Sequence, residues 1–153
     1  MASVEERNKA SIVRFYDEII NQGKVAVVDE LMEPNFVHYG ETLFPRIEGS
    51  AAIKAGVQGV INAYPDGHTT VEDMVAEGDT VVCLLSWRGT HRGPFMGFAP
   101  TGKVSTWRGI STYRFNAAGK IIERWANMDV MGQLRDLGAI SEISFEGNRV
   151  TDH

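Results

Sequence analysis

The hydrophobic periodicity of this chain changes once, near His68, and this change limits the folds available to it. Before that point, apolar residues recur at helical spacing over about Val4–Gln22, over Val25–Met32, and after Ser50 as far as Pro65. After it, β-branched and aromatic residues fill four runs separated by turn residues: Thr69–Ala76, Thr80–His91, Val104–Phe115 and Ile121–Asp129. Helices followed by an antiparallel meander predict an α+β domain.

The predicted helices carry recognisable start and stop signals. Ser3 and Glu6 have the spacing of a capping box, Ser50 can cap the third helix, and Gly23 suits a left-handed helix end. Asn35–Tyr39 is predicted to be a short strand. Two of the later strands approach about twelve residues, so the sheet must bend to remain around one core. We expect a cone-shaped domain in which a strongly bent antiparallel sheet packs on about three N-terminal helices.

Length and composition favour a single domain over residues 1–153, with 139–153 as a loosely held polar tail. The formal charge is −5 and the basic residues are scattered singly, so we expect no nucleic-acid partner. Cys83 is the only cysteine and lies in an apolar run, which predicts a buried thiol in a reducing compartment. No segment has the apolar length of a signal peptide or a membrane span, which favours a cytoplasmic protein without a membrane partner.

Several short motifs are spread along the chain: Gly89–Gly97, Pro100–Lys103, Gly119–Trp125 with Asp129, and the closing Gln133–Gly138. Together they resemble the SnoaL-like polyketide cyclase family. The resemblance implies the cone fold shared with nuclear transport factor 2, ketosteroid isomerase and limonene epoxide hydrolase. It also implies ring closure of a polyketide by an intramolecular aldol step without a metal or cofactor, and assembly as a homodimer or homotetramer.

Asp129 is the leading candidate for acid/base chemistry. A period of two places it on one strand face with Asn127, Trp125, Glu123 and Ile121. An apolar wall, to which Trp125 could contribute, would raise the pKa of its carboxyl group. The resemblance assigns the acid/base role to the aspartate four residues after the tryptophan, which is Asp129 here. An aspartate between a strand and a helix is also an ordinary N-cap, and both interpretations stay open.

Other residues are candidates for the wall of a substrate pocket. His38 and His91 could bind a substrate oxygen, and the Tyr16 hydroxyl could donate to an enolate oxygen or pack in the core. A flat apolar surface could come from Trp87, Trp107, Phe95, Met96 and Phe98, the last three in the long loop Arg92–Lys103 that we expect at the pocket rim. The histidines show no spacing typical of metal ligands, so no metal site is predicted.

The sequence departs from the family's cyclases at one position of interest. Those enzymes pair the aspartate with a histidine on the preceding strand, whereas Val104–Phe115 contains none. The leading hypothesis is a cofactor-independent cyclase or isomerase acting on a small hydrophobic ketone. A non-catalytic domain that binds a small ligand is one alternative. Epoxide hydrolase-like water addition is another, and it needs a second inward aspartate, for which Asp73 is the only strand candidate.

Overall fold

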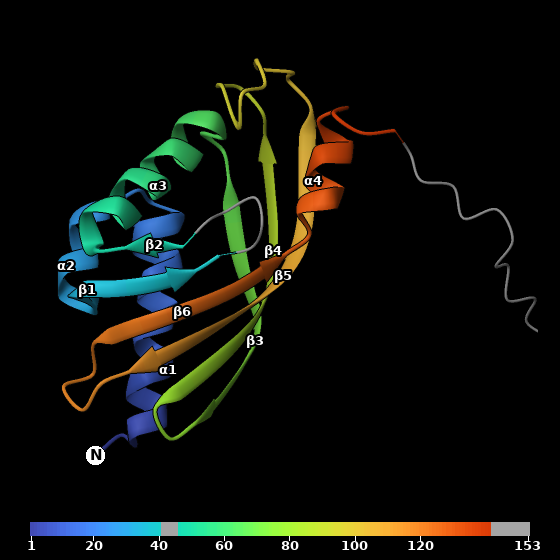
Figure 1. Ribbon diagram of the computed structural model, residues 1–153. Coiled ribbons are helices and arrows are strands. Elements are labelled where there is room, and N and C mark those ends of the chain that lie inside the picture. Colours follow the sequence, from blue (N-terminus) through green and yellow to red (C-terminus); the bar gives the residue numbers. More distant parts are fainter. Residues whose placement is uncertain (41–45, 142–153) are drawn as a thin grey trace, which may run out of the picture.

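The computed structural model describes residues 1–40 and 46–141, which form one bent sheet and its helical cover (Figure 1). The N-terminal part contains α1 (Val4–Arg14), the π-helical η1 (Phe15–Ile20), the 3-10 turn η2 (Val25–Val27), α2 (Val28–Leu31), β1 (Met32–Tyr39), β2 (Ile47–Glu48) and α3 (Ser50–Ala63). The remainder contains β3 (His68–Glu77), β4 (Thr80–Thr90), β5 (Val104–Phe115), β6 (Ile121–Met128) and α4 (Val130–Asp136).

The strand order is β2-β1-β6-β5-β4-β3. Strands β3 to β6 form the predicted antiparallel meander, and β1 adds to it in parallel beside β6. Figure 1 shows the long strands bending around the N-terminal helices, with α4 on the far side beside β5. The predicted α+β architecture is confirmed. We call the sheet face that packs against α1 and η1 the inner face, and the opposite one the outer face.

The structure agrees with the predicted start and stop signals of the helices, with two differences. Ser3 Oγ accepts the Glu6 amide at 3.1 Å and Glu6 Oε2 accepts the Ser3 amide at 3.0 Å, so the capping box is confirmed. The first helix continues to Ile20 by widening into η1. The third helix has Gly49 as its N-cap, so the prediction that Ser50 caps it is wrong. Gly49 leaves β2 with a φ of 85°, which glycine adopts without a Cβ clash, and Ser50 is already the first helical residue.

The core lies between the inner face and the first helix. Ile12, Phe15 and Ile19 belong to one buried cluster with Val81 and Cys83 of β4. Cys83 has no exposed surface, and burial raises the pKa of its thiol to about 12. The buried free thiol predicted from the sequence is confirmed.

A bulge at Ile122 changes which residues of β6 face inward. Arg114 pairs with Glu123 and Phe115 pairs with Ile121, so Ile122 has no partner on β5. An extra residue on one strand shifts the alternation by one. Ile121 therefore faces inward, as Arg124 and Ala126 do, whereas Glu123, Trp125 and Asn127 face outward. The predicted common face of Ile121 and Trp125 is wrong for this reason.

No helix within residues 1–40 and 46–141 combines the length and apolar character that crossing a membrane requires. Most of the predicted tail, residues 142–153, lies outside the described residues.

Candidate functional site

A cluster of polar side chains lies on the inner face, where a core would ordinarily be apolar. The hydroxyls of Tyr16 on η1 and Tyr113 on β5 are 2.5 Å apart. Arg124 on β6 donates through Nε to Tyr113 Oη at 3.1 Å and through a terminal nitrogen to Ser111 Oγ at 3.2 Å. The sheet register aligns these groups, because Tyr113 pairs with Arg124 and Ser111 pairs with Ala126. We call Tyr16, Ser111, Tyr113 and Arg124, with His38, the inner polar cluster.

The two tyrosines carry more hydroxyl protons than their contacts use. Each phenol has one O–H proton, and one of the two is used in the bond between them, whichever hydroxyl donates. The Arg124 donor occupies a lone pair of Tyr113 and adds no acceptor. No other described residue accepts the second proton. The pair therefore presents one free O–H donor inside the cone.

His38 extends this cluster onto β1. It pairs in register with Arg124 across the parallel strands, and only 4% of its surface is exposed. Its Nδ1 atom is buried and has no hydrogen-bond partner among the described residues. Burial, with a smaller effect from the Arg124 charge, lowers the pKa of His38 to about 4. The imidazole is therefore neutral at neutral pH.

The electrostatics of the cluster are those of a cation among neutral groups. Although burial opposes it, the hydroxyls of Tyr113 and Tyr16 hold the pKa of Arg124 above its ordinary value. Burial in turn raises the pKa of Tyr113 well above its usual range, so the phenol stays protonated. Within the described part of the chain, Arg124 has no carboxylate partner. The inner polar cluster thus carries one positive charge.

A second inner cluster is aromatic and contains several of the predicted pocket residues. Trp87 stacks on Trp107 with ring centres 5.6 Å apart, and the edge of Tyr64 meets both Trp87 at 4.8 Å and Phe95 at 5.3 Å. Gln133 of α4 donates to the Tyr64 hydroxyl at 3.4 Å, which ties α4 to this cluster. Trp87, Trp107 and Phe95 were candidates from the sequence for the wall of a substrate pocket, and that role stays a prediction.

His91 is wholly buried beside these rings, 5.3 Å from Tyr64. The Thr101 amide donates to its Nδ1 at 3.2 Å, so the ring proton must lie on Nε2. That Nε2 atom is buried without a partner among residues 1–40 and 46–141. The hydrogen bond from the Thr101 amide to His91 ties the loop that precedes β5 to this buried side chain. Met96 and Phe98, in the same loop, are each 37% exposed.

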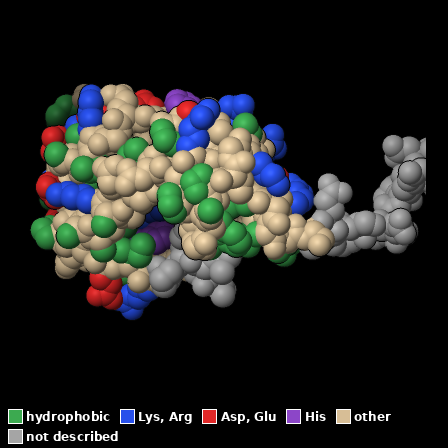
Figure 2. All heavy atoms as spheres, turned by 90° about the horizontal axis from the view of Figure 1, so that it is seen from above, with side chains coloured by type: hydrophobic (Ala, Val, Ile, Leu, Met, Phe, Trp, Pro, Cys, Tyr) green, Lys and Arg blue, Asp and Glu red, His purple; other side chains and the backbone are tan. Residues whose placement is uncertain are grey.

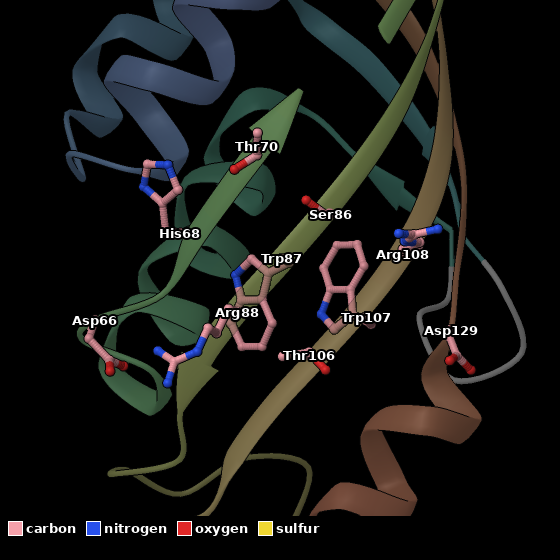
Figure 3. A pocket seen from close by; sticks show the side chains of 10 residues that line it. All are labelled: Asp66, His68, Thr70, Ser86, Trp87, Arg88, Thr106, Trp107, Arg108 and Asp129. Carbon is pink, nitrogen blue, oxygen red and sulfur yellow. The ribbon is translucent and has the colours of Figure 1, made fainter. Parts of the chain in front are cut away.

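Asp129 occupies the N-cap of α4. Its Oδ1 atom accepts the Gly132 amide at 2.8 Å, and the residue is exposed. It borders a shallow depression of about 610 Å³, which is also lined by Asp66, His68, Thr70, Ser86, Trp87, Arg88, Thr106, Trp107 and Arg108. In Figure 3, Asp129 and Arg108 lie at one end of this depression and Asp66 and His68 at the other.

The other outward residues of β6 do not form the expected apolar wall. Trp125 is 40% exposed and stacks on Tyr39 with ring centres 4.6 Å apart, and Asn127 is exposed. The structure therefore separates Trp125 and Asn127 from Tyr16 and His38, which lie across the sheet. Among the described residues, no three His, Cys, Asp or Glu side chains are grouped as they would be around a metal ion.

Sequence reasoning found Tyr16 and His38 but missed Tyr113, Ser111 and Arg124. Alternation along β5 could have indicated Tyr113 and Ser111, since they share a face with the apolar Phe115. Arg124 could not be placed in this way, because its direction depends on the Ile122 bulge.

An open, bent sheet that holds polar groups beneath a helical cover defines the class of cone-shaped α+β domains. The sequence model of the SnoaL-like polyketide cyclase family matches residues 10–137, and this chain belongs to that family.

Comparison with solved structures agrees with this family assignment. AclR from Streptomyces galilaeus, a proposed hydroxylase, is 29% identical with a TM-score of 0.79 over 94% of this chain and 87% of its own. IdmH from Streptomyces antibioticus, a proposed polyketide cyclase, is 28% identical with a TM-score of 0.72 over 86% and 98%. A proposed SnoaL-like polyketide cyclase from Jannaschia sp. CCS1 shares the fold, at 24% identity and a TM-score of 0.83 over 92% and 98%. A search of curated protein sequences found no significant match.

Proposed function

We propose that this protein is a cofactor-independent enzyme of the cyclase or isomerase type that acts on a small hydrophobic ketone inside the cone. The observation that carries the proposal is the free O–H donor of the Tyr16–Tyr113 pair, held beside Arg124. A fixed donor that is shielded from water stabilises the oxyanion that forms when a ketone loses an α-proton. Family membership and the likeness to IdmH support this class of reaction.

The proposed step conserves atoms and charge. A base removes a proton from the carbon next to the carbonyl, and the electron pair moves to the carbonyl oxygen, which accepts the tyrosine hydrogen bond. In an isomerase the enolate takes a proton back at another carbon. In a cyclase the enolate carbon attacks a second carbonyl of the same molecule, so that one C–C bond forms and the new alkoxide is protonated.

We propose Asp129 as the base, on the strength of the family position alone. Its N-cap contact with Gly132 uses Oδ1. Gln133, in the next turn of α4, contacts the Tyr64 hydroxyl of the inner aromatic cluster, whereas Asp129 itself is exposed. His38 is a weaker base because of its low pKa. We therefore assign it hydrogen bonding to the substrate through its unpartnered Nδ1.

Proton exchange tests the proposal without knowledge of the natural substrate. The bicyclic ketone 2-tetralone, incubated in deuterated water, should exchange its α-protons faster with the protein than without it, as followed by proton NMR. Tyr16→Phe should slow this exchange about 10²-fold or more, as expected for the loss of an oxyanion donor. Asp129→Asn should slow it about 10²- to 10⁴-fold, because asparagine keeps the cap but cannot exchange a proton.

Tyr39→Phe is the matched control, since its ring stacks on Trp125 at the outer face. It should exchange at the normal rate. Equal rates for wild type and Tyr16→Phe would contradict the oxyanion role. Tight binding of 2-tetralone without any exchange would favour the alternative function, a non-catalytic domain that holds a small hydrophobic ligand.

We also propose that the chain forms a homodimer or homotetramer through its outer face. Val82, Leu84, Ile110 and Trp125 on this face are each between 37% and 51% exposed. The register makes Leu84 and Ile110 direct neighbours, so the apolar area is continuous across β4 and β5. Contiguous exposed apolar area of this kind favours association.

A further inference from the structure

The inner polar cluster contains a positive charge for which the described chain supplies no counter-ion. The partners of Arg124 are the neutral oxygens of Tyr113 and Ser111. Its guanidinium lies 5.6 Å from the ring centre of Tyr113 and 6.0 Å from that of Phe15. Removing a charge from water is costly unless it is paired, and neutral hydroxyls and rings offset only part of this cost.

The other titratable groups that face Arg124 are neutral as well. His38 on β1 is uncharged at neutral pH, and the Cys83 thiol on β4 is protonated. Burial keeps the Tyr113 phenol on β5 protonated, and its hydroxyl is hydrogen-bonded to that of Tyr16 on η1. The carboxylates of the neighbouring strands, such as Glu123, face outward. Within the described residues, one cation is therefore uncompensated.

The cluster also has unused hydrogen-bonding capacity. A guanidinium has five N–H donors, of which the described contacts occupy two. His38 Nδ1 and one tyrosine O–H are likewise without partners. Figure 2 shows a recess in the face seen from above, with a histidine side chain visible at it. These unused groups lie together, because Arg124 pairs in register with His38 on one side and with Tyr113 on the other.

We propose that the natural ligand is a hydrophobic molecule carrying one anionic oxygen group, a carboxylate or an ionised hydroxyl, which pairs with Arg124. One cation without a second basic side chain matches a monoanion and not a dianion such as phosphate. Phe15 and Tyr113 supply apolar contact next to the charge. This inference deepens the proposed function, because it assigns a charge to the substrate at the same site.

Binding of matched probes tests the inference. Titration followed by fluorescence compares 2-naphthoate with the neutral 2-naphthalenemethanol at pH 7.5. Wild type should bind the anion at least about tenfold more tightly, as expected for a charge-assisted pair shielded from water. Arg124→Met should lose this preference and keep its affinity for the alcohol. A third probe, 2-naphthol, absorbs at longer wavelength when ionised, so its absorption spectrum in the complex shows whether the site holds an ionised hydroxyl, and its affinity is compared with that of 2-naphthoate.

Variants of two other arginines serve as controls for the role of Arg124. Arg114→Met removes an outward guanidinium that pairs with Glu123 at 3.2 Å, and it should leave the preference unchanged. Loss of the preference in Arg108→Met would place the anion in the shallow depression that Asp129 and Arg108 border, and it would overturn the inference. If Arg124→Met does not fold, Arg124→Lys keeps the charge and should retain the preference. Equal affinity of wild type for the anion and the alcohol would also overturn it.

The two proposals can fail separately. Anion preference that depends on Arg124, without α-proton exchange of 2-tetralone, would leave this inference standing and contradict the proposed reaction. Exchange of 2-tetralone that depends on Tyr16, without any preference for the anion, would support the proposed reaction and contradict this inference.

Discussion

The carboxylate of Asp129 has one of the two roles that the sequence left open. Its contact with the Gly132 amide satisfies one of the donors that a helix N-terminus leaves free, so the N-cap interpretation is confirmed. The acid/base role stays a prediction. Trp125, which was expected to shield the carboxyl group, lies on the exposed face and stacks on Tyr39 instead.

At the same scale, His38 should make the protein less stable as the pH falls. Its pKa is about 4 in the folded chain and near 6.5 when unfolded, so the unfolded state binds more protons between these values. This contribution is fully present above about pH 6.5, declines as the pH falls towards 4, and amounts to about 3 kcal/mol over the window. Urea unfolding of wild type at pH 7 and pH 5 should reveal most of it.

His38→Gln should reduce the pH dependence of unfolding over this range, whereas His68→Gln, at an exposed position of β3, should not. The same loss of stability between pH 7 and pH 5 in wild type and His38→Gln would mean that His38 is not held neutral by the fold.

Individual residues were predictable where the local pattern determines their direction. Tyr16 was placed on the inward stripe by helical periodicity, and Cys83 was placed in the core by its apolar neighbours. The inward direction of Arg124 was not predicted, because one unpaired residue at Ile122 reverses the alternation of β6. The position of a bulge depends on the partner strand, so β6 alone does not reveal it.

At the scale of elements, the loop after β4 is fastened to the end of α3. The amides of Arg92 and Gly93 both donate to the Ala63 carbonyl, at 2.8 and 3.0 Å. A Cβ atom at Gly93 would lie 2.3 Å from the Asn62 carbonyl oxygen, which is part of the backbone and cannot easily move. Only glycine therefore allows this approach.

Gly93→Ala should lower the free energy of unfolding by about 1–3 kcal/mol, the usual cost of overpacking. Gly59→Ala is the opposite case, because this glycine lies on the exposed side of α3 with no atom within 4 Å of an added Cβ. It should raise stability by up to about 1 kcal/mol through helix propensity. Urea unfolding measures both, and a neutral Gly93→Ala would show that the loop is not fastened there.

Elements were predictable where they depend on their own residues. The strand Val104–Phe115 was predicted with its observed bounds, and the other meander strands differ by one residue at their ends, because alternation and turn residues define them locally. The parallel pairing of β1 with β6 was not foreseen. It joins segments about eighty residues apart, and nothing in either segment specifies the other.

At the scale of the whole molecule, the outer face should decide the oligomeric state. Ile110→Glu places a charge on the most exposed of the four apolar side chains of this face, so it should dissociate the assembly. Val60→Glu is the control, since Val60 lies on α3, away from this face. Light scattering at micromolar concentration measures both, and a wild-type monomer of 16.9 kDa would contradict the proposal.

The single, wholly buried thiol of Cys83 gives this protein a property that is useful in the laboratory. A thiol-reactive dye can modify it only when the core opens, so the labelling rate reports the population of open molecules. Any compound that binds the folded cone lowers this population and slows labelling in proportion to its occupancy. A library of compounds can therefore be screened for the natural ligand by the protection of one sulfur atom, with no reaction assumed in advance.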